Sequence, residues 1–152
     1  MNKICEFCIK GSPSTVTAQQ KGVRIVGGHA QFFEKKAVTA SKIELKEQML
    51  EYVPDVPIQG AVFVRILWAF SKQTLTRKEA FTFKQSRPDL DNLSKSVLDC
   101  MTDLGFWNDD SQVVREDLTK AWNKQLPGLY IQVWELEPED YETMVMGWRE
   151  CV

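Results

Sequence analysis

Residues 87–114, RPDLDNLSKSVLDCMTDLGFWNDDSQVV, predict a helix, the end of that helix and the start of the next strand. At about 100° per residue, residues 90–104 place their apolar side chains on one face and a charged stripe on the other. The charged stripe consists of Asp91, Lys95, Asp99 and Asp103. Gly105 suits the position just past a helix end. We therefore expect a helix that packs through one face and presents the other to solvent.

The same stretch carries six aspartates, four of them in two tight pairs. Asp89 and Asp91 flank the first helical turn, where free N–H groups and the helix dipole stabilise a carboxylate by ~0.3–1 kcal/mol. An N-cap role would explain one of the two, and Asp109–Asp110 would also fit a plain turn before a strand. The ends of the helix are roughly 20 Å apart. The two pairs can therefore meet only if the strand from Ser111 runs back toward the helix start.

A carboxylate cluster formed in this way would repel itself unless a cation lay within it. Mg²⁺ prefers hard oxygen ligands, usually one or two carboxylates together with water and substrate phosphates. The aspartate pairs are therefore candidate metal ligands as well as candidate caps and turn residues.

The sequence on either side of this stretch predicts more strands and a second main helix. Residues 58–70, IQGAVFVRILWAF, are β-branched and aromatic and predict a central strand. The other expected elements are a strand at 3–9, a loop or small hairpin within 11–36, a helix at 37–53, a mobile basic loop at 71–88, strands at 111–124 and 129–137 joined as a hairpin, and a short acidic helix after Pro138.

These elements predict the α+β class, with a small mixed sheet of about four strands packed against two main helices and a short acidic C-terminal helix. A chain of 152 residues is long enough for one core. We expect a single domain over 1–152, with 1–137 as the core and 138–152 as an acidic C-terminal extension.

Composition narrows the class of protein. The chain is 43% hydrophobic and 26% charged, and no apolar run approaches the ~20 residues of a membrane span. The N-terminal residues alternate instead of forming a signal-type apolar block, so the cytoplasm is the expected location. A single histidine, His29, argues against a His-based triad. Cys5 and Cys8 have half of a zinc spacing, but a strand would point them to opposite faces.

The net charge of −2 hides an asymmetry along the chain. Residues 1–88 carry 14 Lys and Arg against 7 Asp and Glu, whereas residues 89–152 carry 5 against 14. A basic first part beside a concentrated acidic cluster suits a polyanionic substrate held around metal ions. Ordinary solvated faces would explain the scattered lysines but not the aspartate pairs.

The order and spacing of these residues resemble the RusA family of Holliday junction resolvases, whose pattern runs basic–D-L-D-N-x-x-K, then D, then G-x-W-x-D-D-x-Q-V. The matching residues are Asp89, Asp91, Asn92, Lys95, Asp99, Gly105, Trp107, Asp109, Asp110, Gln112 and Val113. The resemblance is strong over 87–114 and continues weakly in the first strand with its GSPS turn, the central strand and the last two strands. The basic run before DLDN is thinner here, with only Lys84 and Arg87 nearby.

The resemblance implies a Mg²⁺-dependent, structure-selective endodeoxyribonuclease that resolves four-way DNA junctions by paired nicks in DNA recombination and repair. Asp89, Asp91 and Asp110 would be the metal-binding catalytic carboxylates, with Mn²⁺ able to replace Mg²⁺. Lys95 would be the essential basic residue, although it could also be a simple i,i+4 partner of Asp91 and Asp99. A homodimer would supply two equivalent sites for a two-fold symmetric junction.

DNA contacts are expected from the basic loop that precedes the helix. The residues assigned to DNA binding are Lys72, Arg77, Lys78, Lys84, Arg87 and Asn92. The acidic tail should face away from the DNA. Two other functions remain open at this point: a Mg²⁺-dependent nucleotide phosphohydrolase, and a module that binds branched DNA without cleaving it.

Overall fold

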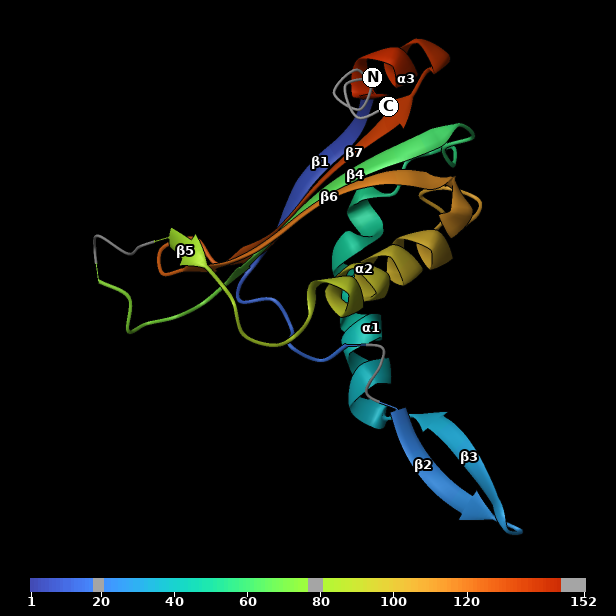
Figure 1. Cartoon of the computed structure of the whole chain (residues 1–152), viewed down its shortest axis with the longest axis vertical. Helices are drawn as coiled ribbons and strands as arrows, with labels where there is room; N and C mark the ends of the chain where they lie inside the picture. Colours follow the sequence, from blue (N-terminus) through green and yellow to red (C-terminus); the bar gives the residue numbers. More distant parts are fainter. Residues whose placement is uncertain (18–20, 77–80, 146–152) are drawn as a thin grey trace.

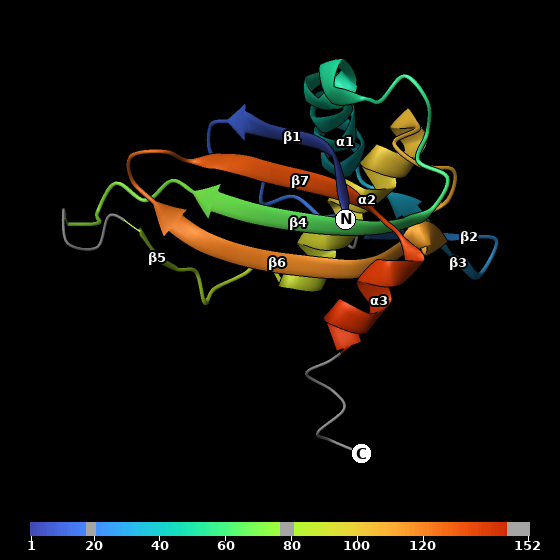
Figure 2. The same ribbon diagram turned by 90° about the horizontal axis from the view of Figure 1, so that it is seen from above.

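The structure is a computed structural model that describes residues 1–17, 21–76 and 81–145. Its main sheet has the strand order β1-β7-β4-β6-β5, and β2 and β3 form a separate two-stranded ribbon (Figures 1 and 2). The strands are β1 (Asn2–Lys10), β2 (Lys21–Val26), β3 (His29–Glu34), β4 (Ala61–Phe70), β5 (Phe81–Phe83), β6 (Val113–Asn123) and β7 (Gly128–Leu136). The helices are α1 (Lys36–Met49), α2 (Leu90–Leu104) and α3 (Pro138–Val145), with short 3₁₀ turns η1 (Leu50–Tyr52) and η3 (Asp110–Gln112). The α+β class is confirmed, and the sheet is larger than predicted.

Strand β4 lies in the middle of the sheet because its side chains are mostly apolar on both faces. It pairs in parallel with β6 and antiparallel with β7. Val64, Ile66 and Trp68 point into the main core, whereas Phe63 stacks on Trp134 of β7 with ring centroids 4.8 Å apart. The central strand expected at 58–70 therefore exists, but it begins at Ala61.

The prediction that the last two strands form a hairpin was wrong. β6 and β7 follow each other along the chain, but β4 lies between them in the sheet (Figure 2). Because β4 is buried, its backbone N–H and C=O groups need hydrogen-bonded neighbours along both edges, and β6 and β7 provide one each. Residues 124–127 therefore pass over the end of β4 and connect β6 to β7.

Helices α1 and α2 pack on one face of the main sheet (Figure 1). Leu93, Val97, Cys100 and Met101 of α2 are buried against β4, as its apolar stripe predicts. Lys42 and Lys46 of α1 pair with Asp99 and Asp103 of α2 across the helix interface. The two helices therefore advance in the same direction, and the start of α1 lies toward the N-terminal half of α2.

Two segments read as loops contain regular structure. Residues 21–34 form the β2–β3 ribbon, which was one of the two possibilities for this region. Residues 81–83, expected to belong to a mobile loop, pair with β6 as the short edge strand β5. The acidic helix expected after Pro138 is present as α3. In the described ranges, no helix has both the length and the apolar character that a membrane span requires.

Candidate active site

Asp89 and Asp91 lie at the start of α2, and both side chains are exposed. Asp89 has the backbone conformation of an N-cap, with φ −75° and ψ 151°, yet its carboxylate makes no capping hydrogen bond. Within the described part of the chain neither aspartate forms an ion pair. Capping therefore does not account for Asp89, and both carboxylates are available to a ligand.

Two lysines hold the segment that leads into this pair. The ammonium of Lys84 donates to the Ser86 carbonyl at 3.0 Å, the Ser86 hydroxyl at 2.8 Å and the Arg87 carbonyl. The ammonium of Lys120 in β6 donates to the Ser86 carbonyl at 3.1 Å and the Pro88 carbonyl at 2.8 Å. The backbone on the N-terminal side of Asp89 is thus fixed to the sheet by charge-assisted hydrogen bonds.

The prediction that Lys84 contacts a DNA phosphate does not agree with this placement. Lys84 is only 4% exposed, and its ammonium lies 4.6 Å from the Trp122 ring centroid and 5.2 Å from that of Phe70. Burial, followed by the nearby Lys120 charge, lowers the pKa of Lys84. Its donors are used inside the fold because the alternative would be an unpaired buried cation. Lys84 therefore positions the loop.

The opposite end of α2 is fixed by the other residues of the sequence motif. Gly105 ends the helix in the left-handed conformation, with φ 84°, and the Trp107 indole donates to the Thr102 hydroxyl at 2.7 Å. The Gln112 amide donates to the carbonyls of Ile58 and Gly60 at 2.9 and 3.0 Å and accepts from the Asn108 and Asp109 backbone amides. These contacts hold the turn to the segment before β4.

The two aspartates of the second pair have different environments. The Asp109 carboxylate accepts from the Ser111 backbone amide at 2.9 Å and caps η3, and hydrogen bonding to Ser111 lowers its pKa. Asp110 is the first residue of η3 and its side chain is exposed. Asp109 therefore has a structural role, whereas the carboxylate of Asp110 faces solvent.

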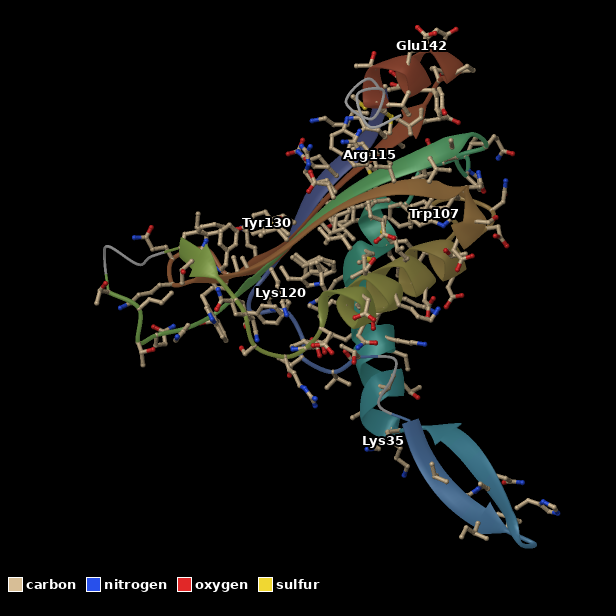
Figure 3. All side chains as sticks on the ribbon, viewed as in Figure 1. Lys35, Trp107, Arg115, Lys120, Tyr130 and Glu142 are labelled. Atoms are coloured by element: carbon tan, nitrogen blue, oxygen red, sulfur yellow. The ribbon has the colours of Figure 1, made fainter. Side chains whose placement is uncertain are left out.

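The two pairs lie at opposite ends of α2. β6 does run back toward the helix start, because Ser94 of α2 donates to Glu116 while Lys120 reaches Pro88. Asp110 precedes β6 and is therefore left beside the C-terminal end of α2, a helix of 15 residues and so about 22 Å long. Lys120 and Trp107 mark the two ends in Figure 3. Among the described residues, no group of three or more potential ligands lies close enough to hold a metal ion.

Lys95 lies one turn beyond Asp91 on the exposed face of α2. Its ammonium is 3.2 Å from Oδ1 of Asp99, and the other carboxylate oxygen, Oδ2, is 3.9 Å from the Lys42 ammonium. The i,i+4 pair considered from the sequence therefore forms with Asp99. The Lys95 side chain is still 58% exposed, so its ammonium remains accessible to a phosphate.

The other residues assigned to DNA binding are scattered. Arg87 is exposed beside Asp89, and the ammonium of Lys72 lies 5.3 Å from the Trp122 ring centroid. Asn92 faces inward, and its buried Oδ1 has no hydrogen-bond partner in the described structure. Arg77 and Lys78 lie outside the described residues.

Sequence reasoning missed Lys120 and Glu116, which connect β6 to the start and the middle of α2. Nothing in their local sequence singles them out. Gln112 was only matched to a pattern, and its amide joins two segments of backbone, 58–60 and 108–109. These contacts depend on which strand lies beside α2, and this can be known only once the order of strands in the sheet is known.

The sequence of the chain matches a family of nucleases. The sequence model of the family described as "Endodeoxyribonuclease RusA" matches residues 12–134. A protein of Lactococcus phage r1t named crossover junction endodeoxyribonuclease rusA is 31% identical over 131 residues, which cover 86% of this chain and 98% of that protein.

The chain belongs to the RusA family of Holliday junction resolvases, the crossover junction endodeoxyribonucleases. The family and the enzyme class predicted from the aspartate motif are thus confirmed, and nucleases of this family depend on a metal ion.

Proposed function

We propose that this protein is a Mg²⁺-dependent, structure-selective endodeoxyribonuclease that resolves four-way DNA junctions by paired nicks, in DNA recombination and repair. It acts as a homodimer in the cytoplasm, where its DNA substrate lies. Asp89, Asp91 and Asp110 are the metal-binding and catalytic carboxylates, and Lys95 assists them. The whole chain 1–152 acts as one domain, with 138–152 as an acidic extension turned away from the DNA.

The observation that carries this proposal is the separation of the exposed carboxylates in one chain. Asp89 and Asp91 supply two hard oxygen ligands, which together with water and a DNA phosphate suit Mg²⁺. Asp110 lies at the far end of α2, beyond the reach of the same ion. A two-fold symmetric dimer can place Asp110 of one copy beside Asp89 and Asp91 of the other, and symmetry then creates two equivalent sites.

Two such sites match the reaction, since a four-way junction has two-fold symmetry and its resolution needs two opposed nicks. A bound Mg²⁺ supplies an activated water and neutralises phosphate charge. The side chains of the protein bind the DNA and position the site. Lys95 and Arg87, both exposed beside the aspartate pair, bind the scissile phosphate and its neighbours, while Lys84 and Lys120 keep the backbone before Asp89 in place.

A gel assay on a synthetic four-way junction tests the proposed function. Paired nicks that require Mg²⁺ support it. Hydrolysis of free nucleotides without junction cleavage would identify a phosphohydrolase. Junction binding without any cleavage would identify a binding module.

Arg87 and Lys84 should respond differently to substitution. Arg87→Ala should weaken binding to every DNA shape and lower the slope of log K against log salt by about 0.9, the value for one lost phosphate contact. Lys84→Ala should instead lower the melting temperature, because it removes the donor to the Arg87 carbonyl and one of the two donors to the Ser86 carbonyl. Salt titrations and thermal melts of both variants check this. A normal melting temperature with a reduced salt slope in Lys84→Ala would restore it as a DNA contact.

A further inference from the structure

The β2–β3 ribbon projects away from the sheet and the helices, beyond the start of α1 (Figure 1). Within the described residues its two strands pair with each other alone, in antiparallel register from Lys21↔Glu34 to Val26↔His29. Gly27 and Gly28, with φ 58° and 82°, form the tight turn at the tip. We call residues 21–34 the arm.

The arm exposes apolar side chains that contribute nothing to the core. Val23, Ile25 and Val26 are 58%, 78% and 48% exposed. Val23 and Ile25 share one face of the ribbon, two residues apart, and register places position 30 on that face. An isolated two-stranded hairpin is marginally stable in water. Burial of such a face against a partner would stabilise it.

The charge of the arm and its base favours DNA as that partner. Residues 21–36 contain four Lys and Arg against one Glu. Lys35 and Lys36 lie exposed at the base of the arm, where Figure 3 labels Lys35. The arm of a second copy carries the same positive charge and would repel this arm, whereas a DNA phosphate backbone carries the opposite charge and would attract it.

The base of the arm lies toward the same half of α2 as the proposed chemistry. It joins the start of α1, and the pairing of Lys42 with Asp99 and of Lys46 with Asp103 sets that start toward the N-terminal half of α2. Asp89 and Asp91 begin that half. A duplex bound at these carboxylates and extending past the start of α1 would reach the base of the arm.

We propose, resting on the proposed function, that the arm is a DNA-binding ribbon that places Ile25 and Val23 against unstacked base pairs at the branch point. Lys35 and Lys36 hold the adjacent phosphates. Apolar side chains inserted between bases must offset the free energy of unstacking, which is highest in a continuous duplex. At a branch point stacking is already interrupted, so the arm favours junctions over duplexes.

The test compares Val23→Ser/Ile25→Ser with the control Val56→Ser, which alters a valine that is 70% exposed outside the arm. Binding is measured in EDTA, without cleavage, to a four-way junction carrying 2-aminopurine at the branch point and to a matched duplex. The arm variant should bind the junction about tenfold more weakly and lose the fluorescence increase caused by unstacking. Its duplex affinity and melting temperature should stay close to those of the wild type, and the control should behave as the wild type.

A second variant tests the base of the arm. Lys35→Gln/Lys36→Gln should lower the salt slope of junction binding by up to ~2 units, about 0.9 per phosphate contact.

Unchanged junction affinity and fluorescence in the arm variant would overturn the arm proposal while leaving the proposed function intact. A changed molecular mass by light scattering, with normal fluorescence at saturating protein, would assign the face to a second copy and would also overturn it. If the wild-type protein does not bind the junction, the proposed function is contradicted, and the arm proposal that rests on it is contradicted as well.

Discussion

Asp89→Asn, Asp91→Asn and Asp110→Asn should each reduce junction cleavage by at least about three orders of magnitude, equivalent to ~4 kcal/mol of transition-state stabilisation. Each substitution keeps the shape of the side chain and removes its charge, so the donor set for a divalent cation is lost. Because all three side chains are exposed, the fold should be unaffected. Junction binding should persist or tighten, since less negative charge faces the phosphates. Single-turnover cleavage and a binding assay on the same preparations check both parts.

The same helix offers a matched control. Asp103→Asn removes a carboxylate from the same stripe of α2, where its partner is Lys46 of α1. A surface ion pair of this kind contributes at most about 1 kcal/mol, and cleavage should stay close to that of the wild type. Full cleavage in any of the three site variants would remove that residue from the catalytic set.

Removal of divalent cations should abolish cleavage, and Mg²⁺ or Mn²⁺ should restore it. Ca²⁺ should restore it poorly, because its longer and more variable ligand distances, about 2.3–2.6 Å against 2.0–2.1 Å for Mg²⁺, misplace the attacking water. Initial rates after dialysis against EDTA, with each metal added back, measure this. Junction binding in EDTA or Ca²⁺ is the control, and it should be retained.

Cleavage at the wild-type rate in EDTA would contradict the metal-dependent reaction. Equal rates with Ca²⁺ and Mg²⁺ would contradict the proposed ligand set, because two carboxylates with water and phosphate should distinguish the two ions by geometry.

Helix α2 could be predicted almost entirely from the sequence. Its apolar stripe, its start at the aspartates and its end at Gly105 are local features, and the structure has them at Leu90–Leu104. β4 could also be predicted, because it is apolar on both faces. The choice of Asp110 over Asp109 rested on a pattern alone, and the different environments of the two carboxylates are consistent with it.

The sheet order could not be predicted in the same way. β6 and β7 are adjacent in sequence and look like a hairpin, but β4 lies between them in the sheet. Which strands pair with β4 depends on the whole sheet and cannot be read from the local sequence of any one strand. The role of Lys84 was missed for a related reason. Its sequence neighbourhood is that of a basic surface loop, whereas β5 turns it inward against Phe70 and Trp122.

The distance between the aspartate pairs was the other feature hidden from the sequence. The motif places them in order within 22 residues, from Asp89 to Asp110, but the direction of β6 along α2 decides whether they meet within one chain. They do not, so the central claim of the proposed function is that two copies complete each site.

Mixed dimers test that claim most directly. A chain with Asp91→Asn and a chain with Asp110→Asn are co-expressed with different affinity tags and purified through both. In the mixed dimer, one site would combine intact Asp89 and Asp91 from one copy with intact Asp110 from the other. We predict that it nicks one strand of a four-way junction at about half the wild-type rate per dimer, although each homodimer is inactive. A mixed dimer as inactive as the two homodimers would contradict the shared site.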